Sequence, residues 1–462
     1  MKNNKSKSKI TFYGGTGSVT GANFLLEVKE KEKVIKILID CGIMQGSAVA
    51  NDFNREEFPY KPEEIDFLLV THSHMDHIGR IPRLVKEGFM GRIISTPPSR
   101  DISEVLFADA IKVMDAESKK SGALPMYDYK DVDKTMGLWE TLEYHKILKL
   151  TDEISIYMKD SGHILGSSMI DVNDGENKII FTGDLGNSPS LLLNDTEEID
   201  NADYIVMESV YGDRNHESKD ERRNKLRNII KDVTQNKQLL IIPAFSLERT
   251  QMLLYEMNNF FENKELESIP VFLDSPLAIK VTKIYQKYSD YLKESVRDEI
   301  KDDDVFNFPK LKSTALSRES EKISLTQNPK IIIAGSGMSS GGRIIQHEKE
   351  HVGDKNAVIL LVGYQSIGTL GRQLEDGAKK VRIYNEEIHV RAKILKIDGY
   401  SSHKDSDNLV NFVETANNNK KLKKVFTVMG EPKSSLFLVQ RLRDELDVKA
   451  EYPEYGKTIE LV

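Results

Sequence analysis

The stretch Thr71–Gly79 reads THSHMDHIG and places three histidines and one aspartate within six positions. His72 and His74 are two residues apart, a spacing that points them in different directions on a helix but lets them converge where a strand ends. Imidazoles and carboxylates together suit zinc or a similar divalent cation. The stretch therefore predicts a strand that ends in a metal-binding loop, with His72, His74, Asp76 and His77 as candidate ligands.

Residues 9–210 read as short β-type runs separated by turns, and several of these runs end in a ligand-type side chain. Asp40 follows VIKILI, His163 stands in DSGHILGSS, and Asp184 stands in FTGDLG. Because strand ends give loops rigid support, the pattern predicts ligands along one edge of a β scaffold. A histidine-rich surface turn without metal is the competing interpretation, and the downstream candidates count against it.

The sequence pattern changes after Tyr211. Apolar runs such as QLLIIPAF and PKIIIAGSG alternate with helix-like segments such as SLERTQMLLYEMNNFFE, whose expected start is Ser246. That alternation predicts a parallel, doubly wound sheet. From about residue 393 the earlier pattern returns, so the fold class is α/β, with one αβ domain interrupted by a second. The predicted boundaries are 1–210, 211–392 and 393–462.

Composition limits the remaining choices. A chain of 462 residues favours two domains, and its net charge of −8 means that a nucleic-acid substrate would need a locally positive or metal-bearing cleft. The single Cys41 excludes an intramolecular disulfide and a cysteine-based zinc site. The start MKNNKSKSKI leads into no apolar signal core, and no run approaches the roughly 18 apolar residues of a membrane span. We therefore expect a cytoplasmic protein without a membrane segment.

Taken together, the motifs resemble those of the β-CASP branch of the metallo-β-lactamase superfamily. THSHMDHIGRIPRLV matches the His-x-His-x-Asp-His signature, and the chain also carries MESVYGDR, IIPAFSLERTQMLLYEM, FLDSPLA, GSGMSSGGR, GYQSIGTLGRQL and GYSSHKD. They look most like the prokaryotic relatives of the cleavage and polyadenylation endonuclease, over about residues 9–440. The resemblance implies a four-layered αββα metallo-β-lactamase sandwich with an inserted doubly wound β-CASP domain.

The resemblance also implies a two-zinc centre. The implied ligands are His72, His74 and His163 for one zinc, Asp76 and His77 for the other, and Asp184 as the bridge. Two metals roughly 3.5–4 Å apart can clamp both the attacking and the leaving oxygen of a phosphodiester, with a metal-bound hydroxide as nucleophile. Asp76 would also orient or deprotonate that water, and Asp40 would steady the histidine loop from behind the ligands.

Glu208 in MESVYGDR and His403 in GYSSHKD match the family's motifs A and B. The resemblance implies that His403 protonates the leaving ribose oxygen while Glu208 orients its imidazole. A leaving alkoxide needs a proton, and a histidine with a near-neutral pKa is a suitable donor. A histidine that merely caps the SSH turn is the alternative.

Motif C departs from the family pattern. FTVMGEPKSS places Met429 where RNA-processing members carry a histidine for the second zinc. A thioether is poorly suited to zinc beside carboxylates, so we expect Met429 to pack against the site. Two hypotheses follow: the second zinc binds more weakly, and cleavage is slow or absent. DNA-processing members also lack this histidine, which weakens the distinction between RNA and DNA.

Two further motifs are candidates for phosphate contacts. GSGMSSGGR (335–343) follows an apolar run, so its backbone N–H groups could cradle a phosphate beside Ser336, Gly337 and Arg343; a tight structural turn is the alternative. Arg249 could contact the RNA backbone; a solvent-facing or salt-bridged side chain is the alternative. GGTGSVTG (14–21) matches neither the GxGxxG spacing nor that of a Walker loop, which argues against a nucleotide cofactor.

The leading prediction is a cytoplasmic zinc-dependent ribonuclease, mainly endonucleolytic, with single-stranded RNA as substrate and a homodimer left open. The alternatives are a DNA-acting β-CASP nuclease and a catalytically impaired RNA-binding homologue. A metallo-β-lactamase hydrolase of esters or lactams is a third option, against which the inserted domain and His403 argue.

Overall fold

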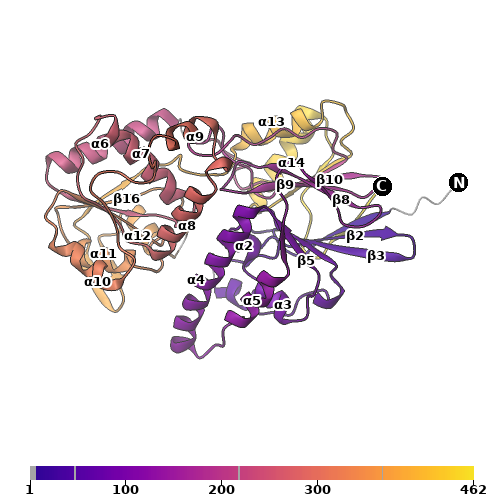
Figure 1. Ribbon diagram of the computed structural model, residues 1–462, viewed down its shortest axis with the longest axis horizontal. Helices are drawn as coiled ribbons and strands as arrows, with labels where there is room; N and C mark the ends of the chain where they lie inside the picture. The colour runs from indigo at the N-terminus through magenta and orange to yellow at the C-terminus, as the bar shows by residue number, and fades with distance from the viewer. Residues whose placement is uncertain (1–6, 46–47, 217–218, 367) are drawn as a thin grey trace. The chain divides into compact units, whose positions relative to one another are not determined.

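The chain folds into two compact units, and the second interrupts the sequence of the first (Figure 1). The computed structural model describes residues 7–45, 48–216, 219–366 and 368–462. The first unit consists of Met1–Asn215 and Ser402–Val462, and the second consists of His216–Ser401.

The first unit contains two seven-stranded sheets that pack face to face. One sheet has the order β22 (Thr458–Leu461), β1 (Ser8–Phe12), β2 (Phe24–Glu30), β3 (Lys33–Ile39), β4 (Phe67–Leu69), β5 (Arg92–Ser95) and β6 (Trp139–Thr141). The other has the order β21 (Ala450–Glu451), β20 (Lys424–Val428), β11 (Tyr204–Glu208), β10 (Lys178–Phe181), β9 (Ser168–Asn173), β8 (Ser155–Asp160) and β7 (Ile147–Lys149). Side chains from both sheets, among them Phe12, Ile156, Phe181 and Phe426, form the apolar core between them.

Helices cover the outer face of each sheet. The helices of this unit are α1 (Ala48–Phe53), α2 (Met75–Ile78), α3 (Ile81–Lys86), α4 (Pro97–Ser121), α5 (Tyr129–Gly137), α13 (Ser406–Ala416) and α14 (Pro432–Leu446), with η1 (Pro62–Glu64) a single 3₁₀ turn. Leu84, Phe107 and Val132 pack α3, α4 and α5 against the first sheet. Leu409 and Leu438 pack α13 and α14 against the second. The order helix, sheet, sheet, helix confirms the αββα sandwich.

Helix α4 lies in a region where the sequence predicted only strands and turns. Its N-cap is Thr96, whose hydroxyl accepts a hydrogen bond from the Ser99 N–H, and prolines occupy its first positions. Proline is tolerated there because the first N–H groups of a helix have no partner within it. The helix ends at Gly122, which adopts a left-handed conformation with φ of 76°.

The second unit is built on a six-stranded sheet in which every pair of neighbours is parallel. The strand order is β14 (Leu311–Ser313), β13 (Val271–Leu273), β15 (Lys330–Ala334), β12 (Leu239–Pro243), β16 (Ala357–Leu361) and β19 (Lys393–Lys396). Strands β12, β15 and β16 are buried throughout, which explains why their sequences are apolar apart from Lys330 at the start of β15. A separate antiparallel pair joins β17 (Lys380–Ile383) to β18 (Glu386–His389).

Helices lie on both faces of this sheet, with α6 and α7 on one side and α10 and α11 on the other (Figure 1). The helices are α6 (Lys219–Gln235), α7 (Arg249–Glu262), α8 (Pro276–Lys287), α9 (Glu294–Ile300), α10 (Ser317–Ser320), α11 (Ile344–His351) and α12 (Leu370–Glu375), with 3₁₀ turns η2 (Ser289–Tyr291) and η3 (Glu321–Leu325). Parallel strands with helices on both faces confirm the doubly wound fold.

Three details differ from the sequence prediction. Residues 211–215 lie in the first unit rather than in the inserted one. Residues 393–401 lie in the second unit rather than with the C-terminal part of the first, because β19 pairs with β16 at the edge of the six-stranded sheet. Helix α7 begins at Arg249 and not at Ser246, because Glu248 takes a left-handed conformation with φ of 64° that no helical residue can adopt.

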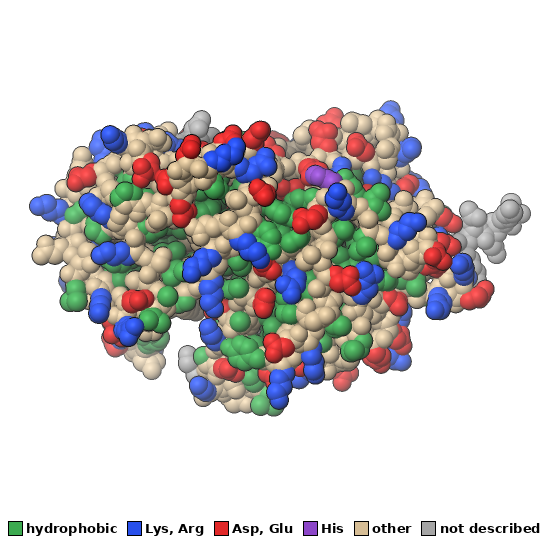
Figure 2. Space-filling model, viewed as in Figure 1, with side chains coloured by type: hydrophobic (Ala, Val, Ile, Leu, Met, Phe, Trp, Pro, Cys, Tyr) green, Lys and Arg blue, Asp and Glu red, His purple; other side chains and the backbone are tan. Residues whose placement is uncertain are grey.

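Among the described residues, no helix combines the length and the apolar character that crossing a membrane requires. Figure 2 shows basic and acidic side chains interspersed over the face in view. On that face, contact with a polyanion would depend on local groups rather than on a continuous basic surface.

Candidate metal centre

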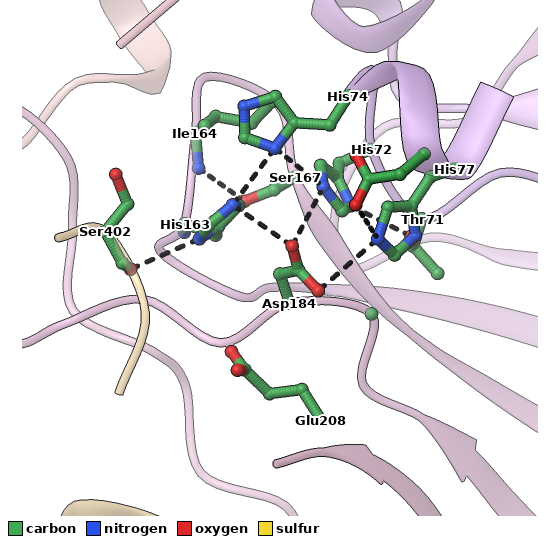
Figure 3. Close-up of polar contacts among 12 residues, drawn as sticks. Thr71, His72, His74, His77, His163, Ile164, Ser167, Asp184, Glu208 and Ser402 are labelled. Atoms are coloured by element: carbon green, nitrogen blue, oxygen red, sulfur yellow. Dashed lines mark hydrogen bonds and ion pairs between the residues drawn. The ribbon is translucent and has the colours of Figure 1, made fainter. Parts of the chain in front are cut away.

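The candidate ligands all follow the carboxyl end of a strand. In the first sheet β3 and β4 are parallel, so Asp40 and the loop at Thr71–His74 emerge at the same edge. In the second sheet β8, β10 and β11 run in one direction, and His163, Asp184 and Glu208 stand at or just beyond their ends. Figure 3 shows how these segments bring the side chains together.

Three imidazoles and one carboxylate point at a common centre. His74 Nδ1 lies 3.1 Å from His72 Nε2 and 3.2 Å from His163 Nε2 (Figure 3). Asp184 Oδ2 lies 3.4 Å from the Nε2 atoms of both His72 and His163. These four donor atoms lie within 4.8 Å of one another. The sequence named all four residues as ligand candidates, and the structure brings them together.

In two of these imidazoles, those of His72 and His163, the opposite ring nitrogen already has a partner. His163 Nδ1 donates to the carbonyl oxygen of Ser402 at 3.2 Å. His72 Nδ1 lies 3.1 Å from Thr71 Oγ1, whose own proton goes to Asp40. The Nε2 atoms of both histidines therefore present lone pairs to the centre, where they repel one another unless a cation lies between them. This donor set fits a divalent metal.

Burial sets the charge state of the same groups. Removal from water lowers the pKa of His72, and it lowers the pKa values of His74 and His163 strongly, so these rings are neutral and able to coordinate a metal. Burial would raise the pKa of Asp184, but the imidazoles of His77, His403 and His72 outweigh it and hold that pKa well below its usual range.

A second group of donors lies on the other side of Asp184. His77 Nε2 is 3.4 Å from Asp184 Oδ1 and 4.0 Å from Asp76 Oδ2. Within the described part of the chain, His77 Nε2 and Asp184 Oδ1 are both buried and have no hydrogen-bond partner. Buried polar atoms are costly without partners, so this pair also fits a cation, with Asp184 shared between the two positions.

Asp40 orients this second group. Its Oδ2 accepts a hydrogen bond from His77 Nδ1 at 2.7 Å, which leaves His77 Nε2 free to coordinate. Thr71 holds the carboxylate in place through its N–H and its hydroxyl, both at 2.8 Å. The sequence singled out Asp40 but missed Thr71, although a threonine directly before the His-x-His pair was a usable signal.

Glu208 and His403 form a pair beside the four-donor cluster. His403 Nδ1 lies 3.1 and 3.2 Å from the two carboxylate oxygens of Glu208, and 3.9 Å from Asp184 Oδ2. Glu208 is fully buried and also accepts a hydrogen bond from the Leu185 N–H at 2.6 Å. Burial would lower the pKa of His403, but the carboxylates of Glu208 and Asp184 outweigh it and raise the pKa to about 10.

Met429 takes part in the core between the two sheets. Its side chain is buried, its φ is 49°, and its N–H donates to the carbonyl oxygen of Gly15 at 2.6 Å. A Cβ added to Gly15 would lie 2.6 Å from the Met429 sulfur. The thioether therefore packs in apolar surroundings against the loop that follows β1.

The residues named as phosphate contacts are mostly occupied within the second unit. Arg343 forms an ion pair with Asp274 at 2.6 Å and donates to two backbone carbonyls. Arg249 is 8% exposed and donates to the carbonyl of Val362. Both guanidinium groups thus have structural partners, an acidic side chain for Arg343 and a backbone carbonyl for Arg249.

In the loop at 335–343, fewer polar groups are available to bind a phosphate than the sequence suggested. Gly337 is buried against the ring of Phe245, and its carbonyl accepts a hydrogen bond from Gln365. The Ser336 hydroxyl lies 2.9 Å from the Ser340 N–H and accepts its proton. Ser336 is only half-buried and stays accessible at the loop surface.

Three family models match successive parts of the chain. Residues 25–210 match the metallo-beta-lactamase superfamily domain, residues 250–374 match the Beta-Casp domain, and residues 387–453 match the Zn-dependent metallo-hydrolase RNA specificity domain. The first and third matches contain the proposed ligands and His403, and the second lies within the unit that contains the parallel sheet.

Similar proteins span most of the chain. A ribonuclease of Thermus thermophilus is 32% identical over 88% of this chain and 90% of its own. Transcription termination factor FttA of Pyrococcus horikoshii is 30% identical over 98% of this chain and 71% of its own. A crystal structure of a protein of unknown function from Enterococcus faecalis covers 98% of this chain and all of its own, with a TM-score of 0.56 and 13% identity, which shows a shared fold.

Proposed function

The chain belongs to the β-CASP branch of the metallo-β-lactamase superfamily, and from this premise we propose that it is a metal-dependent ribonuclease that cuts within single-stranded RNA. The observation that carries the proposal is the convergence of one ring nitrogen each from His72, His74 and His163 around the Asp184 carboxylate. Relatives named as ribonucleases support RNA as the substrate.

We assign zinc to the centre on the chemistry of its donors, which are imidazoles and carboxylates. His72, His74, His163 and Asp184 would hold one ion, and Asp76, His77 and Asp184 the second. Bound metal would lower the pKa of a water molecule and polarise the phosphodiester, which gives a nucleophile at neutral pH. Asp76 then serves as a ligand and as an acceptor that orients the attacking water.

His403 is the proposed general acid. Its Nδ1 is held by both carboxylate oxygens of Glu208, so the ring keeps a fixed orientation beside Asp184. The Glu208 carboxylate also stabilises the protonated ring. A cleaved RNA strand leaves as a ribose alkoxide, and a proton from His403 would convert it into a neutral hydroxyl.

A cleavage assay tests the proposal. Wild type and Asp76→Ala are compared on a circular single-stranded RNA and on a circular DNA of the same sequence, with zinc or manganese added. Circular substrates have no ends, so any cleavage is endonucleolytic. We expect wild type to open the RNA circle and Asp76→Ala to lose at least about 100-fold in rate.

Each other outcome has a defined meaning. RNA cleavage that survives Asp76→Ala at the wild-type rate would show that the activity lies elsewhere or comes from a contaminant. Cleavage of DNA alone would favour the DNA-acting alternative. Binding of RNA without cleavage would favour the impaired homologue, the alternative suggested by the buried thioether of Met429 in place of a ligand.

A further inference from the structure

Lys404 directly follows the proposed acid, His403, and is buried. It is neither a proposed metal ligand nor the proposed proton donor. Its side chain is 6% exposed. The ammonium donates to the carbonyl oxygen of Gly186 at 3.0 Å, to Thr196 Oγ1 at 2.8 Å and to Ser188 Oγ at 3.5 Å. An ammonium group has three protons, and these three neutral oxygens accept all of them.

Burying the Lys404 ammonium costs more free energy than a purely structural contact would justify. Burial lowers the pKa of Lys404 to about 8, although the nearby carboxylates of Asp195, Glu208 and Asp405 act in the opposite direction. A buried ammonium whose hydrogen bonds all go to neutral oxygens adds little stability, since apolar side chains of similar volume fill such space at lower cost. This cost is understandable if the contact positions other groups.

The three acceptors lie on the segment that follows the bridging aspartate. Gly186 is two residues after Asp184, and its N–H donates to the carbonyl of Ser161, in the loop that carries His163. Thr196 Oγ1 donates to the same Ser161 carbonyl at 2.9 Å. A Cβ on Gly186 would collide with the carbonyl oxygen of Gly162, so the two loops are in close backbone contact.

The backbone around Lys404 is tied to the same segment. Its N–H donates to the carbonyl of Leu185 at 2.9 Å, and the Asn187 N–H donates to the carbonyl of Ser402 at 2.9 Å. His403 thereby pairs with Gly186 as a single antiparallel β-bridge. The Ser402 carbonyl also accepts from His163 Nδ1, as Figure 3 shows.

We propose that Lys404 is a positioning residue that fixes the Asp184 segment against the His403 turn through the Gly186 carbonyl. Lys404 thus sets the distance between the metal-bridging carboxylate and the acid without touching substrate. The inference rests on the proposed function for its catalytic consequence, whereas its consequence for metal binding is independent of the substrate.

The central experiment compares Lys404→Met with Lys330→Met. Lys330 is a matched control because it is also buried, and its ammonium donates to the carbonyls of Ile323 and Thr326 at 2.9 and 2.7 Å in the second unit. Apo protein is titrated with Co²⁺, whose absorption reports on coordination, and kcat and KM are measured on single-stranded RNA.

We expect Lys404→Met to bind Co²⁺ about 10-fold more weakly, with an altered spectrum, because a group that supports a ligand is lost. We expect kcat to fall about 10- to 100-fold while KM changes little, because small misplacement of reacting groups acts on the chemical step. Lys330→Met should keep the wild-type Co²⁺ affinity and kcat, because its contacts lie in the second unit, which holds none of the proposed ligands. If folded Lys404→Met matches Lys330→Met in both readouts, the proposal is overturned.

Two further measurements keep the test decisive. Lys404→Ala should regain kcat in ethylammonium, which restores the donor, and not in tetramethylammonium, which has no proton to donate. If both Lys404 variants fail to fold, Thr196→Val removes one acceptor and should shift Co²⁺ affinity in the same direction; an unchanged affinity would overturn the proposal. A wild type without ribonuclease activity would refute the proposed function, and the Co²⁺ titration would still decide the role of Lys404.

Discussion

Asp40 lies behind the proposed ligands and determines which ring nitrogen of His77 can coordinate a metal. It accepts the Nδ1 proton of His77, and this choice of tautomer leaves the Nε2 lone pair for a metal. Thr71 fixes the carboxylate with two hydrogen bonds, so neither residue needs to contact the metal to affect its binding.

Asp40→Asn is therefore expected to weaken metal binding about 10- to 100-fold, because the amide group can face His77 Nδ1 with its own protons. Isothermal titration of apo protein with zinc measures the effect. Asp174→Asn is the control, since Asp174 is a fully buried aspartate that accepts hydrogen bonds from Ser8 and Asn177. Equal affinity in the two variants would contradict the role given to Asp40.

Met429→His tests whether the second metal position lacks a donor. Histidine tolerates the left-handed backbone at this position better than most residues do, so the change is compatible with the φ of 49°. We expect the zinc content after dialysis to rise towards two per chain, and the cleavage rate to rise with it. Met429→Leu keeps the apolar volume and adds no donor. Wild type that already retains two zinc ions would contradict the expectation.

Glu208→Gln tests the proton donor through the pH dependence of the rate. The acid must be protonated, so activity is lost as the pH rises through the pKa of His403. The Glu208 carboxylate is one of the two groups that raise this pKa to about 10, and its removal lowers the pKa. The alkaline limb of the pH–rate profile should therefore move to lower pH, by about 1–3 units.

Glu197→Gln serves as the control for that measurement, because Glu197 pairs with His145 at 2.9 Å on the surface of the same unit. Its pH–rate profile should coincide with that of wild type. If Glu208→Gln also left the alkaline limb in place, another group would have to supply the proton.

At the scale of elements, strands were easier to predict than helices. The runs LLIIP and KIIIA are uninterrupted and short, and they form central strands of the parallel sheet. Helix α4 was missed because its buried apolar side chains, among them Ile102 and Phe107, reach no further than Ile111, and nothing beyond Ile111 is buried among its described side chains. A helix that extends past its core carries a weak amphipathic pattern.

The end of β8 supplies a prediction about stability. Asp160 is 6% exposed, and its Oδ1 accepts a hydrogen bond from the Gly162 N–H in the loop that leads to His163. Burial raises the pKa of Asp160 to about 7. The folded state therefore prefers the protonated acid, and stability is lost as the pH rises from about 4, the unfolded value, through 7.

Asp160→Asn should remove this loss, because the amide oxygen can still accept from Gly162 and carries no charge. The variant should gain about 1–4 kcal/mol in unfolding free energy relative to wild type at pH 8, and much less at pH 4. Urea unfolding at the two pH values measures the difference. A gain that is the same at both would show that ionisation of Asp160 is not its cause.

At the scale of the whole molecule, the proposed metal ligands all belong to the first unit, although the second unit interrupts the sequence between Asp184 and His403. Ligand binding stabilises the state that binds it. Removal of metal by a chelator should therefore increase hydrogen exchange at the strand ends before His72, His163 and Asp184.

Strands β12 and β15 of the second unit should keep their protection in the same experiment, which hydrogen-exchange mass spectrometry can follow peptide by peptide. Return of zinc should restore the original pattern in the first unit. Uniform deprotection of both units would mean that the metal stabilises the chain globally rather than the unit that holds its ligands.

The sequence by itself determined the fold class, the interrupted layout and the ligand-type residues, because these follow from local patterns: period, apolar runs and the spacing in THSHMDHIG. Only the tertiary structure decided which atoms meet. In the tertiary structure Thr71 donates to Asp40, and Lys404 donates to the carbonyl of Gly186. Strand β19 pairs within the six-stranded sheet of the second unit, and Arg249 and Arg343 bind groups of that same unit. Such contacts depend on strand order and on hydrogen bonds between distant segments, which no local pattern encodes.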